Sequence, residues 1–279
     1  SKFSCSADNF VLKVNTQQLT KYIYYYLSIN IKVLQKGFIG AGLQHISKDY
    51  ISNIKIPIPS VEKQHEMVNY LDFIYEKSNK TSNEKIAELM QLNQFCLNNE
   101  KMFCANITKT LGEVCKVNQG TYIKSDMKIP GEYPVYGGGN ASYYIDKYNR
   151  EDEIIVAKDG VSSDCVRYEQ NKFFLNHHGW TINCTDDIIK KYMFYHLQSI
   201  QPELLSIAKG TAQLGINQQN FYKLQIKIPS ISRQKEIVEY CEYNDTLIKQ
   251  LETGIQNNKK QAQQFITAIV KAQVKEDTE

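Results

Sequence analysis

Two nine-residue stretches, IPIPSVEKQ at 56–64 and IKIPSISRQ at 226–234, determine how this chain is organised. In each stretch, alternating apolar residues lead to a proline, which is followed by a serine and later by a glutamine. The alternation has the two-residue period of a strand with one buried face, and the proline would end that strand. The serine stands where its side chain can cap the first turn of a helix. We therefore predict short strands at 54–59 and 224–229, each leading directly into a helix.

Both stretches belong to a longer internal repeat with a constant offset of 170 residues. Residues 2–72 align with 172–242 without a gap, and seventeen of the 71 aligned positions are identical. One ungapped offset over this length is hard to explain by chance, so one structural unit is used twice. In each copy a tyrosine-rich helical stretch, at about 19–35 and 187–207, precedes a glycine-containing loop and the predicted strand. We expect the tyrosines of these helices to belong to the core.

A long helix follows the strand in each copy, over 61–106 and from 231 to the end of the chain. In the second helix, the residues that recur with alternating steps of three and four are Cys241, Asn244, Ile248, Leu251, Ile255, Asn258, Ala262, Phe265, Ile269 and Ala272. The first helix is less regular: Val68, Leu71 and Ile74 are followed by a polar stretch at 76–85 before Ile86, Leu89, Leu92, Phe95 and Met102 resume the apolar pattern. This spacing predicts a coiled-coil seam between the two helices, in which the two asparagines would help to fix the register. Two separate core helices are the alternative.

The segment 107–171 has no counterpart before residue 2. It combines glycines and tyrosines with short apolar runs at 114–117, 133–136 and 154–157, so it is expected to form a small, mostly β module. A complete first copy would contain such a module as well. We therefore expect the front of the first copy to be missing.

Bulk properties are those of a soluble globular protein. Hydrophobic residues make up 42% of the chain and charged residues 23%, and the net charge of +3 permits nucleic-acid binding without requiring it. We find no apolar run of the roughly 20 residues that a membrane span needs, and no signal peptide. The seven cysteines are scattered, without a Cys-x-x-Cys pair, which favours reduced thiols in the cytoplasm over disulfides or zinc.

Catalytic motifs are absent from the chain. The six prolines form no Pro-Pro pair, as the Asn-Pro-Pro-Tyr motif of DNA-amino methyltransferases requires, and no Glu-x-Lys of a metal-dependent nuclease occurs. The glycines at 137–139 are not flanked by the strand and long helix of a cofactor-binding loop, so a tight turn is the simpler interpretation. We expect no enzymatic activity, no cofactor and no metal.

These parts together resemble one family, the DNA-specificity subunits of type I restriction–modification systems. The similarity covers essentially the whole chain, and the order and duplication of the motifs make it specific. Beyond the two nine-residue stretches, the motifs that carry it are LGEV at 111–114, Gly120, YPVYGGG at 133–139 and AKDG at 157–160.

The resemblance implies an α+β chain in which β-rich target-recognition domains are joined by two long antiparallel coiled-coil helices with pseudo-two-fold symmetry. Its parts would be a partial first recognition domain (1–60), a spacer helix (61–106), the second recognition domain (107–230) and another spacer helix (231–279). Each recognition domain would read half of a bipartite site on double-stranded DNA, while the helices set the spacing. Methyltransferase subunits would dock on the helices, and a restriction (translocase) subunit can join. The missing front leaves the first half-site in doubt.

Candidate DNA-binding residues lie in the loops of the second recognition domain, because loops on a rigid scaffold often carry binding groups. Lysine would contact phosphate, whereas serine, threonine, histidine and glutamine side chains can also contact base edges. Plain solvated turns are the alternative for most of them, and adjacent histidines on a strand would make a poor metal pair. The candidates are Tyr136, Asn140, Lys158, Ser162, Ser163, Arg167, His177, His178, Thr211 and Gln213.

Two other functions fit the sequence. The chain could be the recognition portion of a larger DNA methyltransferase or nuclease, or a coiled-coil scaffold that binds only protein. Binding to duplex DNA that weakens steeply with salt distinguishes a DNA reader from such a scaffold, because phosphate contacts release counterions.

Overall fold

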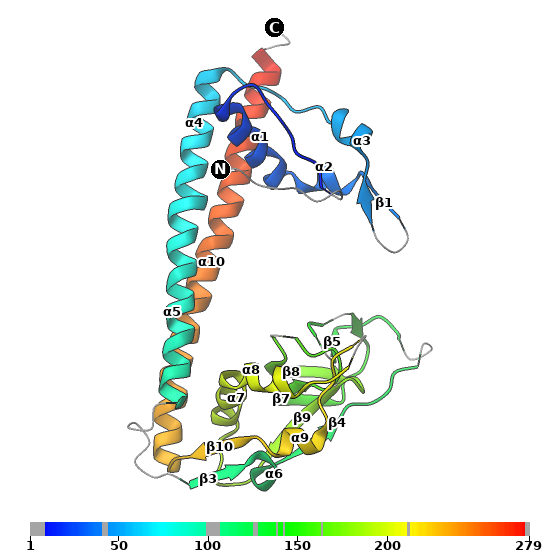
Figure 1. Cartoon of the computed structure of the whole chain (residues 1–279), viewed down its shortest axis with the longest axis vertical. Helices are drawn as coiled ribbons and strands as arrows, with labels where there is room; N and C mark the ends of the chain where they lie inside the picture. The colour runs from blue at the N-terminus through cyan, green and yellow to red at the C-terminus, as the bar shows by residue number, and fades with distance from the viewer. Residues whose placement is uncertain are drawn as a thin grey trace. The chain divides into compact units, whose positions relative to one another are not determined.

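The computed structural model describes residues 9–40, 44–98, 107–124, 128–137, 139–141, 143–162, 164–210 and 213–276. The chain divides into two compact units (Figure 1). Unit 1 comprises Ser1–Ala87 and Leu247–Glu279, and unit 2 comprises Glu88–Thr246. Two long helices, α5 (Asn79–Asn98) and α10 (Ile231–Glu276), each contribute residues to both units.

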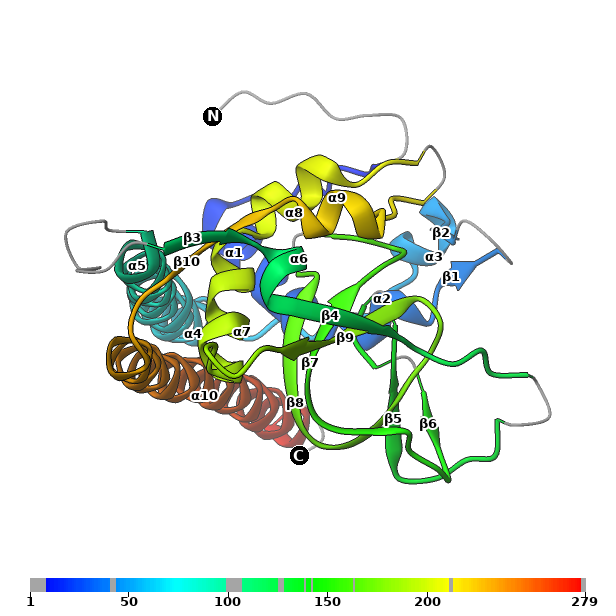
Figure 2. The same ribbon diagram turned by 90° about the horizontal axis from the view of Figure 1, so that it is seen from below.

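Unit 2 is built around a six-stranded sheet with the order β4-β9-β7-β8-β5-β6 (Figure 2). All neighbouring strands are antiparallel except β5 and β8, which are parallel. Strands occur at all three apolar runs noted in the sequence of 107–171. The strands are β4 (Cys115–Gln119), β5 (Tyr133–Tyr136), β6 (Tyr144–Ile145), β7 (Arg150–Ala157), β8 (Val166–Leu175) and β9 (Gly179–Cys184).

The repeated part of unit 2 packs against this sheet. Helices α7 (Lys190–Ser199) and α8 (Gln201–Ile207) precede α9 (Gln218–Tyr222), as the sequence predicts for a helical stretch at about 187–207. Strand β10 (Gln225–Ile228) pairs antiparallel with β3 (Ile107–Thr110), which leads into the short helix α6 (Leu111–Val114). The core joins sheet residues to helix residues, among them Ile154, Val156, Trp180, Tyr192, Met193 and Phe221.

Unit 1 is mostly helical. Its core places Tyr22 and Tyr25 against residues of α4 and of the C-terminal part of α10. Its only described strands form the two-stranded sheet β1–β2. In chain order, the elements before α5 are α1 (Gln17–Ile29), α2 (Ile31–Gln35), β1 (Phe38–Ile39), β2 (His45–Ile46), α3 (Lys48–Ser52), α4 (Val61–Asp72) and the π-helix η1 (Phe73–Ser78).

The internal repeat extends to individual side-chain contacts. A buried tyrosine donates to a backbone carbonyl in each unit, Tyr22 to Pro57 at 2.6 Å and Tyr192 to Lys227 at 2.7 Å. These partners are themselves 170 residues apart. Glutamines at the start of the long helices do the same, Gln64 to Pro59 at 2.8 Å and Gln234 to Pro229 at 3.0 Å. The serine caps also recur, with Ser60 accepting from the Lys63 amide and Ser230 from the Arg233 amide, both at 3.3 Å.

The glycine-containing loops are equivalent hairpins. Ile39 pairs with His45 in unit 1, and Lys209 pairs with Gly215 in unit 2, again at the offset of 170. Gly40 and Gly210 adopt positive φ angles of 122° and 144°. Such angles strain any residue with a Cβ atom, which explains why glycine stands at both positions.

The residues predicted to form the seam on the second helix lie on a buried face. From Cys241 to Ile269 every predicted seam position is buried or half-buried; the side chain of Ala272 lies outside the described residues. Two polar contacts join the helices, Asn244 to Asn93 at 2.7 Å in unit 2 and Asn258 to Asn79 at 3.0 Å in unit 1. In unit 1 the Tyr70 ring packs on Phe265, with centroids 4.5 Å apart, and Asn79 contacts Asn258, so the two helical segments run antiparallel there.

The seam predicted on the first helix is only partly correct. Val68, Leu71, Ile74 and Leu89 are buried and Ile86 is half-buried, but Leu92 and Phe95 are exposed, and Cys96 and Leu97 are buried instead. Repeated steps of three turn each position by about 60° away from one face, because a helix has 3.6 residues per turn. The side chains at 86, 89, 92 and 95 therefore rotate progressively off the buried face of the helix. Met102 lies outside the described residues, and the described helix ends at Asn98.

The strand predicted at 54–59 is wrong, whereas its counterpart is confirmed as β10. Strand β10 forms because it pairs with β3, and no described strand lies in position to pair with 54–59. In addition, the first copy has Pro57 at the position of Lys227, and proline has no backbone N–H that could donate to a neighbouring strand.

One tyrosine expected in the core is on the surface. Tyr22 and Tyr25 are buried, but Tyr24 is 65% exposed. Its counterpart Phe194 packs on Tyr168 of β8, with ring centroids 5.6 Å apart. The described part of unit 1 contains no six-stranded sheet that would cover Tyr24 in the same way.

Two further properties concern the described part of the chain. None of its helices is both long and apolar enough to span a membrane. Its cysteines, at positions 96, 115, 165, 184 and 241, are free thiols.

Candidate nucleic-acid interface

Three loops of unit 2 meet where strand β7 ends and strand β9 begins. They are residues 158–161 after β7, the turn 176–178 between β8 and β9, and the described residues of the hairpin 209–216; together we call them the loop cluster. The amide of Lys158 donates to the carbonyl of His178 at 2.9 Å, and the Lys158 carbonyl accepts from the amide of Ile216 at 2.8 Å. Main-chain hydrogen bonds therefore fix the three loops to one another.

Charged and aromatic side chains are held together on this loop cluster. The carboxylate of Asp159 lies 3.2 Å from His178 Nδ1 and 3.6 Å from Lys158 Nζ. All three side chains are partly exposed, so these contacts are weak and leave the Lys158 ammonium accessible to a further anion. This part of the loop cluster suits contact with a polyanion.

The two histidines lie in a tight turn and not on a strand, so their side chains are not forced to opposite faces as we predicted. Their ring centroids are 3.8 Å apart, and the His177 ring also contacts that of Tyr122 at 5.0 Å. Burial lowers the pKa of His177, and the neighbouring His178 lowers it further, which favours the neutral ring. Among the described residues, no group of three or more histidine, cysteine, aspartate or glutamate side chains is placed to hold a metal.

Two glycines allow the turn at Asn176 to pack tightly. A Cβ atom at Gly120 would lie 1.9 Å from the Asn176 carbonyl oxygen, and one at Gly137 would lie 2.5 Å from Asn176 Oδ1. The amide of Gly120 also donates to the carbonyl of Gly179 at 3.1 Å. Any side chain at Gly120 or Gly137 would displace the turn, so these residues position the histidines that follow it.

Tyr136, Asn140 and Arg167 form a second group. The Arg167 guanidinium donates to the carbonyl of Gly139 and, at 3.4 Å, to Asn140 Oδ1, and it lies over the Tyr136 ring at 5.5 Å. Burial raises the pKa of Tyr136 to about 12, assisted by Glu169, which accepts a hydrogen bond from the hydroxyl at 2.8 Å. Arg167 and Tyr136 thus have partners within unit 2 that hold the 139–140 loop.

The other predicted residues are less closely connected. Ser162 is exposed and accepts from the amide of Asp164 at 3.4 Å, and Gln213 is exposed at the tip of its hairpin. Ser163 and Thr211 lie outside the described residues. Sequence reasoning missed Tyr122. The signal available in the sequence was Gly120, two residues earlier, because a glycine can mark a point where another backbone segment approaches closely.

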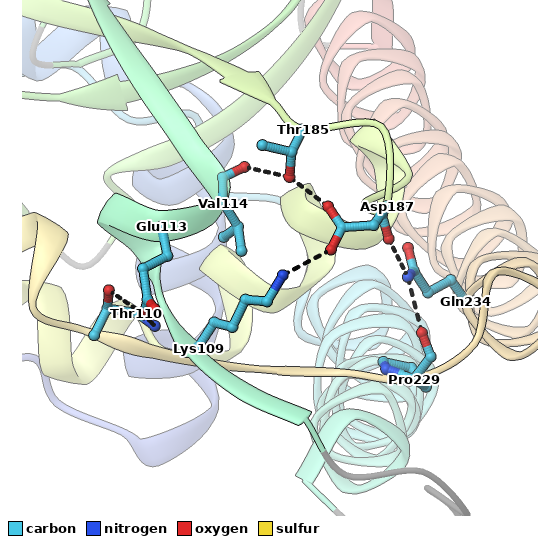
Figure 3. A network of polar contacts seen from close by, with 8 residues as sticks. All are labelled: Lys109, Thr110, Glu113, Val114, Thr185, Asp187, Pro229 and Gln234. Atoms are coloured by element: carbon cyan, nitrogen blue, oxygen red, sulfur yellow. Dashed lines mark hydrogen bonds and ion pairs between the residues drawn. The ribbon is translucent and has the colours of Figure 1, made fainter.

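A polar network connects β3 and the segment after β9 to helix α10 within unit 2 (Figure 3). Asp187 accepts from Lys109 of β3 at 3.0 Å, and its carboxylate lies 2.5 Å from the hydroxyl of Thr185. The side-chain amide of Gln234 donates to the carbonyls of Asp187 and Pro229, at 2.8 and 3.0 Å. Gln234 is fully buried and also accepts from a backbone amide at 2.8 Å. The motif glutamine therefore has a structural role.

Known proteins with similar sequences come from restriction systems. A type I restriction enzyme specificity subunit of Methanocaldococcus jannaschii is 22% identical over 277 residues, which cover 82% of this chain and 64% of that protein. A Haemophilus influenzae protein described as a type I restriction enzyme specificity subunit is 26% identical over 137 residues, 47% of this chain and 35% of that protein. The match to a type I specificity subunit of Mycoplasma genitalium covers 45% of the length of that protein. This chain thus spans less than half the length of these last two relatives.

Solved structures show a similar fold. The S subunit of a type I restriction-modification system from M. genitalium has a TM-score of 0.54 at 18% sequence identity, covering 89% of this chain and 72% of that one. A chain from a structural study of complex assembly and conformational transition of the type I R-M system has the same TM-score at 15% identity, covering 90% and 70%. The mixed helix-and-sheet fold is thus the α+β class that the sequence predicts.

The family is established by sequence. The Type I restriction modification DNA specificity domain matches residues 1–91 and 106–261, which is most of the chain. The chain therefore belongs to the family of type I restriction modification DNA specificity domains.

Proposed function

We propose that this chain is a sequence-specific DNA-recognition subunit of a type I restriction–modification complex and that unit 2 reads one half of a bipartite target. The loop cluster is the observation that carries this proposal. Lysine and histidine side chains from two of the loops lie close together, and main-chain hydrogen bonds to each other and to the third loop fix these loops before DNA arrives. Such preorganisation reduces the entropy lost on binding.

Different residues would serve different parts of the DNA. Lys158 would contact phosphate, and the histidines and Gln213 would contact bases, with Ser162, Ser163 and Thr211 as further contacts from the same loops. Arg167 would act by holding the loop that carries Asn140, because its donors already have protein partners. Tyr136 would support the same loop.

The paired helices would act as the ruler between half-sites. Equivalent contacts at an offset of 170 residues support a pseudo-two-fold relationship, and the asparagine pairs support an antiparallel coiled coil of fixed register. The proposed parts remain a partial recognition domain at 1–60, spacer helices at 61–106 and 231–279, and a recognition domain at 107–230.

Chemistry would come from partners in the complex. Methyltransferase subunits would dock on the helices, and a restriction or translocase subunit can join them, whereas this chain would supply no catalytic group. Free thiols at the described cysteines are consistent with a cytoplasmic location.

Exchange of the recognition module tests the proposal. Residues 107–225 are replaced by the same region of a relative with another target, and methylated sites are mapped after pairing with the methyltransferase. We expect one half of the split target to change while the spacer length stays the same. An unchanged target would contradict the assignment of recognition to unit 2. If duplex DNA binds only weakly and without salt dependence, the chain is a protein scaffold.

A further inference from the structure

We infer that Tyr122, paired with His177, is a specificity-determining residue whose ring contacts a base of the target and not the phosphate backbone. This inference rests on the proposed function, because it assigns a role within the same DNA-reading surface. Tyr122 follows β4 in the sequence and contacts the loop cluster through His177.

The exposure of Tyr122 is unusual for a residue whose backbone is so well fixed. Its side chain is 63% exposed, although the preceding residues are held in place. The Gly120 amide donates to Gly179 at 3.1 Å, and the Thr121 amide donates to Leu175 at 2.9 Å. Thr121 also forms a bridge with Asn176 at the start of the histidine turn. The aromatic ring is thus presented to solvent from a fixed position, as a ring that stacks on a ligand must be.

The partner of Tyr122 is an aromatic ring that carries little charge near neutral pH. The ring centroids of Tyr122 and His177 are 5.0 Å apart, and burial keeps the pKa of His177 below its ordinary value. The pair therefore offers phosphate little electrostatic attraction. Aromatic faces are instead suited to stacking on bases and to apolar contact with the thymine methyl group.

Neighbouring polar groups would position DNA next to Tyr122 and His177. The His177 ring touches that of His178, and both His178 Nδ1 and Lys158 Nζ lie close to the same oxygen of Asp159, Oδ2, at 3.2 and 3.6 Å. A phosphate bound near Lys158 would position the duplex, and Tyr122 would then contribute sequence preference. Phosphate contacts position DNA and base contacts specify it.

The test compares substitutions in the full chain. Duplexes are selected from a randomised pool with the purified wild-type protein, and binding to the enriched sequence is measured over a range of salt concentrations for each variant. For Tyr122→Ala we expect roughly tenfold or greater loss of affinity for the selected duplex, relaxed preference at one base pair, and an unchanged salt slope. Tyr122→Phe, which keeps the ring, should retain the affinity.

A matched control is Tyr243→Ala on α10, since Tyr243 is also 63% exposed but lies outside the recognition module. It should bind like the wild type. Circular dichroism establishes that each variant is folded. If the wild type selects a sequence and Tyr122→Ala binds it equally well, the role of Tyr122 is refuted while the proposed function stands. If Tyr122→Ala flattens the salt slope, the ring acts on the backbone and the inference is also wrong. If the wild type enriches no sequence, the proposed function fails and this inference fails with it.

Discussion

The hydroxyl of Tyr192 donates a 2.7 Å hydrogen bond to the backbone carbonyl of Lys227, and this contact ties helix α7 to strand β10. Tyr22 and Pro57 make the same contact in unit 1 at 2.6 Å. Because both tyrosines are fully buried, water cannot replace the hydroxyl if it is lost. A repeated sequence has thus kept a repeated internal hydrogen bond.

Removal of this hydroxyl should destabilise the unit that contains it. We expect Tyr192→Phe and Tyr22→Phe each to lower the free energy of unfolding by about 1–3 kcal/mol, since a buried carbonyl loses its donor. Denaturant titration of the full chain measures the effect, with the exposed Tyr243→Phe as control. Equal stability of all three variants would show that the contact is not needed.

Charge on the helix seam should be much more costly than charge outside it. Ile255 is buried on α10, and Lys259 on the same helix is exposed. Ile255→Asp would bury an unpaired carboxylate, so we expect a loss of about 4 kcal/mol or more in unfolding free energy, whereas Lys259→Asp should cost less than about 1 kcal/mol. Similar thermal midpoints for the two variants would mean that the seam is misassigned.

Stability should fall in mild acid because of His196. Burial lowers the pKa of this histidine from 6.5 to about 4, and its Nε2 lies 3.1 Å from the Gln225 carbonyl oxygen. Between these pH values the unfolded chain binds a proton that the folded chain excludes, so stability is full above pH 6.5 and falls as the pH drops toward 4. The loss approaches about 3 kcal/mol.

The control for this effect is His196→Gln. Its amide can still donate to the Gln225 carbonyl but does not titrate. Unfolding free energies measured from pH 7 to pH 4 should therefore decline less in this variant than in the wild type. An identical decline in both proteins would show that other groups cause it.

Lys158 should contribute affinity without sequence preference. If it contacts phosphate, Lys158→Ala should weaken binding to all duplexes alike and reduce the slope of log affinity against log salt by about 0.9. Fluorescence anisotropy on selected and unrelated duplexes measures both quantities, with Lys259→Ala as a control on the helix. A change in preference at a single base pair would instead identify Lys158 as a base-reading residue.

The isolated chain should neither methylate nor cleave DNA. With S-adenosylmethionine, ATP and magnesium supplied, we expect no methyl transfer and no nicking, because its sequence lacks the motifs that such chemistry uses. Radiolabel incorporation and plasmid cleavage assays measure the two activities. Turnover that persists through repeated purification would overturn the non-catalytic role.

Sequence reasoning about local elements succeeded where neighbouring residues supply the interaction. The serine caps at Ser60 and Ser230 depend on contacts within one helical turn, and the buried face of α10 follows from the spacing of its apolar residues, so the sequence predicts both. Reasoning from spacing failed at 54–59, which has the pattern of a strand but no described pairing partner. A strand is stable only when another strand satisfies its backbone groups.

The candidate site shows the same division. The sequence pointed to Lys158 and the two histidines as loop residues. It gave no sign that Tyr122 lies beside His177, or that Arg167 is hydrogen-bonded to the 139–140 loop. These relationships depend on the packing of segments that lie far apart in the chain.

The repeat, the family and the long helices with their serine caps were therefore determined by the sequence alone, because the motifs, periodicity and caps that indicate them each span only a few residues. Only the tertiary structure decided which loops meet where β7 ends and β9 begins and which polar groups remain exposed there. Glycines at 120 and 137 allow the turn at Asn176 to pack closely, and hydrogen bonds between distant segments then place Lys158, His178 and Tyr122 around it.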